Sequence, residues 1–276
     1  MLLRTNTLVH EVIEMPKNEK KQINARSIEE FYDLLAPEYD TMTGFEKRFV
    51  QERPFLQALI GRFHFQSALD AGCGSGFHSI LLSQLGVNVT GVDVSAEMLR
   101  LAQDHARANN VQLRTLQGAF ENLGELMKER FASVFVMGNS LVHLLSSDEV
   151  EKELRNFAEV LETRGVLVIQ ILNYERVLAA RAHIQNEKQA GAKTFVRSYD
   201  YDDMGVLFNI LTREQKDVTI EERMQTIRLR PVLRTELMTL LKRVGFVDIE
   251  LFGGISQLPF DAANSKDLVV LAIKKG

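Results

Sequence analysis

A glycine-rich turn and two carboxylates are the residues of this sequence best suited to bind a ligand. Asp70 and Asp93 each end a short apolar segment, and three glycines follow the first carboxylate: Gly72, Gly74 and Gly76. Glycines let the backbone approach a ligand closely. A carboxylate that ends the second strand of a β-α-β unit can accept hydrogen bonds from both ribose hydroxyls of an adenosine. The spacing therefore predicts a nucleoside-binding site.

The spacing of the glycines also separates this turn from the dinucleotide-binding sequence G-x-G-x-x-G. Here the spacing is G-x-G-x-G and Asp70 precedes it, so a cationic ligand fits better than a pyrophosphate. A nicotinamide-dependent oxidoreductase on the same fold stays an alternative. That class would favour the longer spacing, and it would leave the segment Gly138-Asn139-Ser140 unexplained.

The elements that position these residues alternate between strand and helix. Short apolar segments predict strands, and apolar residues at helical spacing predict helices. The pattern indicates the α/β class, with a doubly wound, mostly parallel, seven-stranded Rossmann-like sheet whose last strand can run antiparallel. We expect its strands at 67–71, 87–92, 111–116, 131–137, 166–172, 246–252 and 268–273.

The chain is expected to divide into a core and two covers on the ligand side of the sheet. The core comprises residues 61–175 and 232–276, and a helical cover comprises residues 1–60. Residues 176–231 form an inserted antiparallel β cover, because apolar and polar residues alternate from 194 to 230 and Asp202-Asp203-Met204-Gly205 predicts a turn.

Composition narrows the class of protein. The chain has 276 residues, of which 45% are hydrophobic and 25% charged, as in ordinary globular proteins. Its net charge of −4 offers no basic excess for binding nucleic acid. A single cysteine and no Cys/His cluster predict neither a disulfide nor a metal site. Without a signal-type N-terminus or an apolar run of roughly 20 residues, we expect a soluble cytoplasmic protein with no membrane partner.

The motifs resemble those of the class I S-adenosylmethionine-dependent methyltransferases. The resemblance rests on Leu69-Asp70-Ala71-Gly72-Cys73-Gly74-Ser75-Gly76 together with Val92-Asp93-Val94-Ser95. The segments from Gly138 to Leu144 and Asn173-Tyr174 are similar to the glycine and sarcosine N-methyltransferase branch. The resemblance covers most of the chain from about residue 30.

The resemblance implies S-adenosylmethionine as the cofactor and S-adenosylhomocysteine as its product. Arg48 would meet the methionine carboxylate, Asp93 the ribose, and Met98 and Phe120 the faces of the adenine. Met98 could equally be a core residue. The cofactor-binding residues predicted in this way are Tyr39, Arg48, Asp70, Gly72, Cys73, Gly74, Asp93, Val94, Met98, Ala119, Phe120 and Gly138.

Two positions depart from the family pattern. Gln117-Gly118-Ala119-Phe120 lacks the usual acidic residue for the adenine amino group, so a backbone group, Gln117 or Glu121 must replace it. Leu172 stands where the glycine methyltransferases carry an arginine for the substrate carboxylate, which argues against glycine as the substrate. An anionic acceptor would have to bind Arg228 or Arg230, unless both arginines are simply solvated.

The acceptor site is predicted from topology. Asn139 and His143 follow the fourth strand and Tyr174 follows the fifth, so all three should lie at the carboxyl edge of the sheet. We expect these three residues to be catalytic, with Tyr39 and the inserted strands completing the pocket. His143 can serve as a hydrogen-bond donor or as a base near pH 7.

The predicted function is methyl transfer to a small-molecule acceptor, an amine or a hydroxyl, in which the protein mainly aligns the reactants. We expect a monomer or homodimer. A non-catalytic module that binds S-adenosylmethionine is the alternative. A nucleic-acid methyltransferase would need a basic face, whereas acidic residues are interspersed among the arginines of residues 221–236.

Overall fold

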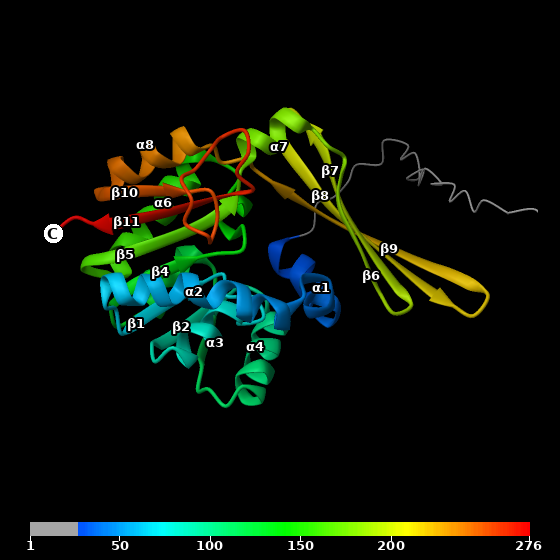
Figure 1. Ribbon diagram of the computed structural model, residues 1–276, viewed down its shortest axis with the longest axis horizontal. Helices are drawn as coiled ribbons and strands as arrows, with labels where there is room; N and C mark the ends of the chain where they lie inside the picture. The colour runs from blue at the N-terminus through cyan, green and yellow to red at the C-terminus, as the bar shows by residue number, and fades with distance from the viewer. Residues whose placement is uncertain (1–26) are drawn as a thin grey trace, which may run out of the picture.

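The computed structural model describes residues 27–276 and builds them around a seven-stranded sheet (Figure 1). The strand order is β10-β11-β5-β4-β1-β2-β3, and β11 runs antiparallel to both of its neighbours. The predicted fold class is therefore confirmed. Residues 1–26 of the predicted N-terminal cover lie outside the described residues. The strands of this sheet are β1 (Ser67–Ala71), β2 (Asn88–Asp93), β3 (Arg114–Gln117), β4 (Phe131–Val136), β5 (Leu161–Leu172), β10 (Phe246–Phe252) and β11 (Asp267–Lys274).

Helices cover both faces of this sheet, so its central strands must be apolar on both sides. In β4, Val134 and Val136 belong to one apolar cluster and Phe135 to the other. The cluster around Phe135 packs under α2 (Phe45–Phe63), α3 (Phe77–Gln84) and α4 (Ala96–Ala108). The opposite cluster packs under α5 (Leu123–Leu126), α6 (Ser147–Val160) and α8 (Arg234–Val244).

The starts of α4 and α6 are fixed by side-chain caps. The Ser95 hydroxyl accepts a hydrogen bond from the backbone N–H of Met98, which begins α4 directly after β2. Ser146 and Glu149 form a capping box at the start of α6. Both helices therefore begin at the carboxyl edge of the sheet. None of the described helices is long and apolar enough to cross a membrane.

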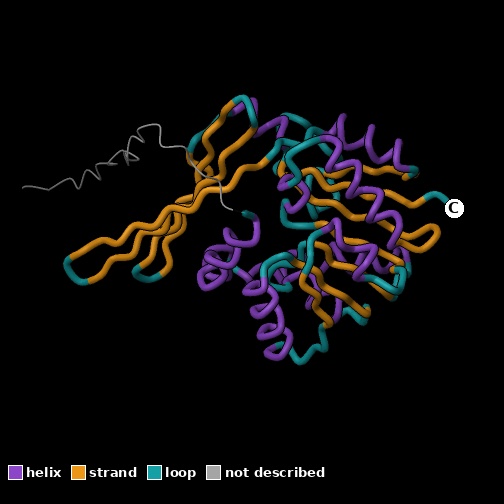
Figure 2. Tube along the Cα trace, turned by 180° about the vertical axis from the view of Figure 1, so that it is seen from behind, coloured by secondary structure: helices purple, strands orange, loops and turns teal. Residues whose placement is uncertain are grey.

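A second, four-stranded antiparallel sheet is inserted between α7 (Tyr174–Ala180) and α8. Its two long hairpins project away from the core (Figures 1 and 2). The turn predicted at 202–205 joins its second and third strands. The sequence pattern missed the first strand because its residues are mostly polar and exposed. The strands are β6 (Ile184–Ala190), β7 (Lys193–Asp202), β8 (Gly205–Lys216) and β9 (Thr219–Leu229).

Helix α1 (Ile28–Thr43) connects the core to this inserted sheet through polar contacts. On the core side, the Ser95 hydroxyl donates to the Asp33 carboxylate at 2.6 Å. On the other side, the buried Glu38 carboxylate pairs with Lys193 at 2.8 Å and with Arg223 at 2.6 Å. Lys193 and Arg223 belong to β7 and β9, so the inserted sheet supports α1 directly.

Candidate active site

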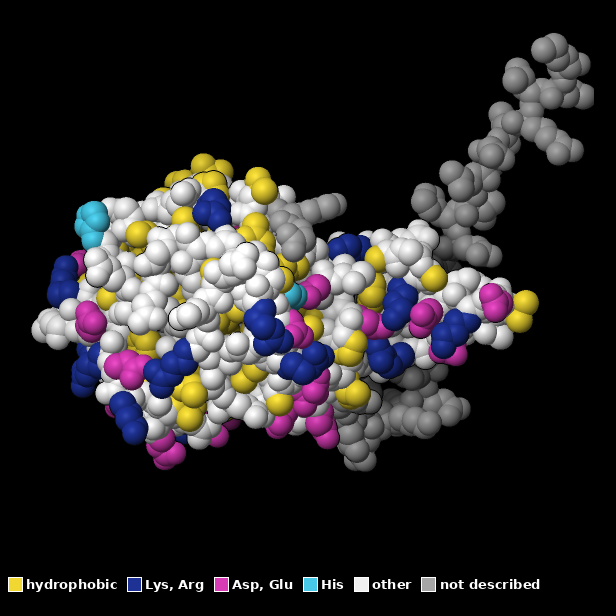
Figure 3. Space-filling model, turned by 90° about the horizontal axis from the view of Figure 1, so that it is seen from below, with side chains coloured by type: hydrophobic (Ala, Val, Ile, Leu, Met, Phe, Trp, Pro, Cys, Tyr) yellow, Lys and Arg dark blue, Asp and Glu magenta, His cyan; other side chains and the backbone are white. Residues whose placement is uncertain are grey.

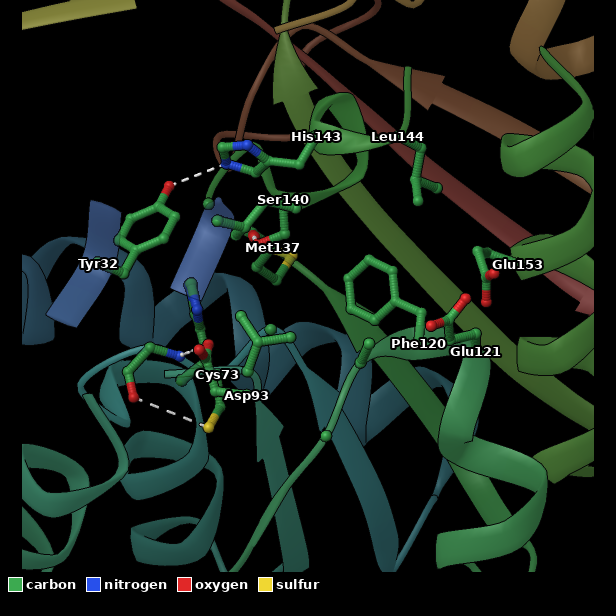
Figure 4. Close-up of a pocket in the computed structure, with 18 of the residues that line it drawn as sticks. Tyr32, Cys73, Asp93, Phe120, Glu121, Met137, Ser140, His143, Leu144 and Glu153 are labelled. Carbon is green, nitrogen blue, oxygen red and sulfur yellow. Dashed lines mark hydrogen bonds between the residues drawn. The ribbon is translucent and has the colours of Figure 1, made fainter. Parts of the chain in front are cut away.

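A cavity of about 400 Å³ opens at the carboxyl ends of β1, β2 and β4, beneath α1 (Figure 4). Such a position is where doubly wound sheets bind their ligands. Among the described residues that line it, none comes from the inserted sheet. Most of the predicted cofactor-binding residues do line it, namely Tyr39, Arg48, Gly72, Cys73, Gly74, Asp93, Val94, Ala119, Phe120 and Gly138.

Asp93 ties the glycine turn to the end of β2. One carboxylate oxygen accepts the backbone N–H of Gly74 at 2.8 Å, and the other accepts that of Ser95 at 3.0 Å. Gly72 and Gly74 have φ angles of +75° and +54°, which L side chains rarely adopt. Burial raises the pKa of Asp93, while the two N–H donors oppose that rise. The turn and the carboxylate therefore form one preorganised wall of the cavity.

Asp70 and Met98 do not line the cavity, in contrast to their predicted roles. The Asp70 carboxylate is buried in the protein and accepts a hydrogen bond from the Ser79 hydroxyl at 2.6 Å. Burial raises the pKa of Asp70. Met98 is buried within the fold. Asp70 therefore ties the end of β1 to α3, and Met98 belongs to the buried side of α4.

One end of the cavity carries an arginine and a histidine. Arg48 and His78 both line it, and both contact the same carboxylate of α2, that of Glu52. The Arg48 Nε–Glu52 distance is 2.7 Å and the His78 Nε2–Glu52 distance is 2.9 Å. Burial alone would raise the pKa of Glu52, but its contacts with His78 and Arg48 outweigh burial and lower it to about 2. Glu52 therefore holds both side chains in place.

A tyrosine–histidine pair also lines the cavity. Tyr32 of α1 and His143 of the 3₁₀ helix η2 (Ser140–His143) both line the cavity, and Tyr32 Oη lies 2.9 Å from His143 Nε2 (Figure 4). Burial lowers the pKa of His143 to about 4, so the imidazole is neutral at pH 7. A role as a base near pH 7, one of the two predicted roles, does not fit this pKa.

Sequence reasoning missed Tyr32, Glu52 and His78. A usable signal existed for Tyr32, because it precedes Tyr39 by two helical turns and both therefore lie on one face of α1. His78 and Glu52 gave no such signal, because their contact joins two helices.

Asn139 and Tyr174 differ from their predicted place at the acceptor, because neither lines the cavity. The Asn139 amide donates to the Tyr174 hydroxyl at 3.0 Å and accepts the backbone N–H of Leu172 at 3.0 Å. Tyr174 has no exposed surface. These contacts fasten the loop after β4 to the end of β5, and thereby fix the loop that carries His143.

The two arginines considered for an anionic acceptor are already paired. Arg228 makes two hydrogen bonds to the Asp202 carboxylate, at 2.7 and 2.8 Å. Arg230 lies 2.5 Å from the Glu236 carboxylate. Neither lines the cavity, and their side chains are only 18% and 20% exposed, so they form partly buried ion pairs and are not the solvated residues of the alternative interpretation.

The neutral His143 predicts a measurable effect on stability. The unfolded histidine gains a proton as the pH falls below about 6.5, whereas the folded one resists protonation until about pH 4. Its stability contribution is therefore complete above pH 6.5 and declines toward pH 4. Between pH 7 and pH 5 the wild type should lose about 1–2 kcal/mol more free energy of unfolding than His143→Gln. Urea unfolding at both pH values measures this difference, and parallel losses in the two proteins would contradict it.

Comparison with known proteins agrees with this geometry. A family model described as "Methyltransferase domain" matches residues 68–165. A glycine/sarcosine N-methyltransferase from Aphanothece halophytica is 27% identical over 228 residues, covering 83% of this chain and 84% of the relative. Another from Parasynechococcus marenigrum (strain WH8102) is 32% identical over 160 residues, covering 58% and 57%. The chain is an S-adenosylmethionine-dependent methyltransferase.

The solved structures agree with the fold of this methyltransferase. An S-adenosylmethionine-dependent methyltransferase from Clostridium acetobutylicum ATCC 824 superimposes with a TM-score of 0.75 at 17% identity, covering 89% of this chain and 99% of that one. The cavity itself also fits the methyl donor. A Cβ added at Gly138, whose φ is +68°, would meet nothing within 4 Å, so its backbone is open to a ligand. Arg48, Asp93 and Phe120 offer a cation, a diol acceptor and an apolar face, as the donor requires.

Proposed function

We propose that this methyltransferase transfers a methyl group to the uncharged amine of a small molecule that carries no carboxylate beside that amine. The observation that supports the proposal best is the Tyr32–His143 pair, which is neutral and hydrogen-bonded at 2.9 Å on the cavity wall. The relatives that share the largest part of the chain are named N-methyltransferases, which favours nitrogen as the attacked atom.

The proposal that the acceptor carries no carboxylate rests on the residues that could bind one, since Arg48 is assigned to the carboxylate of the donor. Leu172 cannot bind an anion, and Arg228 and Arg230 are paired with Asp202 and Glu236. Neither arginine lines the cavity, so each would have to leave its partner and move to reach an acceptor. The known substrate class of the relatives therefore does not transfer directly to this chain.

When bound, S-adenosylmethionine supplies a methyl group already activated on a sulfonium. The chain then has to bind and orient the two reactants and to exclude water. The Tyr32 hydroxyl can donate to His143 and keep its lone pairs for the N–H of the acceptor. The neutral His143 imidazole would add no repulsion to the positive charge of a sulfonium bound in the same cavity. Because its pKa is about 4, His143 does not retain a proton at pH 7, so the proton of the methylated amine leaves to water.

A panel of acceptors tests this proposal. Purified protein is incubated with S-adenosylmethionine and with amino sugars, apolar primary amines, glycine, sarcosine and phenols, and S-adenosylhomocysteine formation is measured. We expect turnover with one or more amines that lack a carboxylate, with a rate that rises with pH as the acceptor loses its proton. Turnover confined to glycine and sarcosine, or to phenols, would contradict the proposal.

We infer further that nucleic acid is not a partner and that the protein acts in the cytoplasm as a monomer or homodimer. Basic and acidic side chains alternate over the face shown in Figure 3, where no basic patch suited to a phosphate backbone is displayed. The net charge of −4 points the same way. Steady methylation of RNA or DNA without methylation of small molecules would contradict this inference.

A further inference from the structure

The far end of the cavity, beyond Asp93, has no assigned role so far. The cavity continues past Val94, Ala119 and Phe120, whose side chains are apolar, and it ends between the 3₁₀ helix η1 (Phe120–Asn122) and α6. A donor with its carboxylate at Arg48 and its ribose at Asp93 must place its base in this part. The base edge carries an amino group, and the apolar side chains around it cannot accept a hydrogen bond.

Four polar side chains line this end of the cavity: Glu121, Glu149, Lys152 and Glu153. Glu149 is committed to the capping box, because its carboxylate accepts the backbone N–H groups of Leu145 and Ser146. The side chains of Glu121 and Lys152 are each 60% exposed, where water competes for their hydrogen bonds. Only the side chain of Glu153 is withdrawn from water, at 4% exposure.

Only one of the two oxygens of the Glu153 carboxyl group is hydrogen-bonded among the described residues. Its Oε2 accepts the Asn156 side-chain amide at 2.7 Å. Its Oε1 lies 3.9 Å from Lys152 Nζ, which is beyond hydrogen-bond distance, and has no donor among the described residues. Figure 4 places this carboxyl group beside Phe120 and Glu121 at the edge of the cavity. A buried acceptor with a free oxygen is therefore present where the base edge must lie.

We propose that Glu153 of α6 is a specificity-determining residue that accepts a hydrogen bond from the 6-amino group of the adenine. A desolvated carboxyl group discriminates strongly between a ligand that satisfies it and one that does not. Burial also raises the pKa of Glu153, which agrees with a position closed to water. This inference concerns the methyl donor and is independent of which acceptor is methylated.

Calorimetry with two ligands tests the assignment. The first ligand is S-adenosylhomocysteine, and the second is its purine analogue with hydrogen in place of the 6-amino group. We expect the wild type to prefer S-adenosylhomocysteine by about 10- to 50-fold. In Glu153→Leu this preference should fall close to 1, because only the ligand with the amino group loses affinity. Glu121→Leu, at the exposed rim, should keep the wild-type preference.

The ratio of the two affinities separates recognition from damage to the fold. A folding defect lowers both affinities together and leaves the ratio unchanged, which overturns the proposal. If Glu153→Leu binds neither ligand, the ratio is measured in Glu153→Gln instead. A preference at least about 3-fold below that of the wild type then supports the proposal, and an unchanged preference overturns it. A wild-type ratio near 1 overturns it directly. A failed acceptor panel leaves this ratio unaffected, so the two proposals fail separately.

Discussion

Replacing Asp93 with alanine should lower the affinity for S-adenosylhomocysteine about 100-fold, or about 2.7 kcal/mol. Asp93 lines the cavity, and its two oxygens also accept the backbone N–H groups of Gly74 and Ser95. The alanine variant therefore loses the acceptor for the ribose hydroxyls and leaves both N–H groups without their partner. Isothermal titration calorimetry at constant salt measures the loss.

The matched control for this experiment is Asp93→Asn. Asparagine keeps the shape of the side chain and one acceptor oxygen, so we expect a smaller loss of about 10-fold. An affinity of Asp93→Ala equal to that of the wild type would show that the donor binds elsewhere.

Gly72→Ala should lower the free energy of unfolding by about 3 kcal/mol. Gly72 has a φ of +75°, and a Cβ built there would lie 2.8 Å from the Ser140 hydroxyl oxygen and 3.0 Å from the Ser140 Cβ. Ser140 cannot easily move aside, because its hydroxyl donates to the Met137 carbonyl at 2.8 Å. Backbone strain and a steric clash therefore add, and urea unfolding measures their sum.

Gly138→Ala separates these two causes. Its φ of +68° is similar, but an added Cβ meets nothing within 4 Å, so only the strain of about 1 kcal/mol should appear. In the double variant Gly72→Ala/Ser140→Gly the clash is removed and most of the additional loss should disappear relative to Ser140→Gly alone. Equal losses in Gly72→Ala and Gly138→Ala would rule out the clash.

The part of the cavity lining that the sequence located is the part built by adjacent residues. The turn from Gly72 to Gly74 and the carboxylate Asp93 follow directly from the ends of β1 and β2, which pair in parallel from Ser67 to Ala71. A motif of this kind carries its own geometry, because its backbone conformation and its neighbours along the chain are fixed together.

The residues that were missed or misplaced depend on contacts between distant segments. Tyr32 reaches His143 across 111 positions, and Glu52 reaches His78 across 26. Periodicity identifies the buried face of a helix but not its partner. Asn139 and Tyr174 do lie at the predicted edge of the sheet, yet their side chains bond to each other, and topology alone does not specify side-chain direction.

The place of the inserted sheet in the chain has a consequence for the evolution of this protein. The core strand β5 pairs with β11, from Leu172 with Asp267 to Val166 with Ile273, so the whole insertion is a loop closed by a core strand pair. Doubling the length of such a loop adds only about 0.6 kcal/mol to the entropy of closing it. The entropy of closure therefore does not restrict the length of residues 184–229, and an exchanged insertion has only to keep apolar residues where Phe195, Ile210 and Ile227 join the core cluster. Because the inserted sheet supports α1 and supplies none of the described lining residues, such exchanges would reposition Tyr32 while the donor-binding turn stays unchanged.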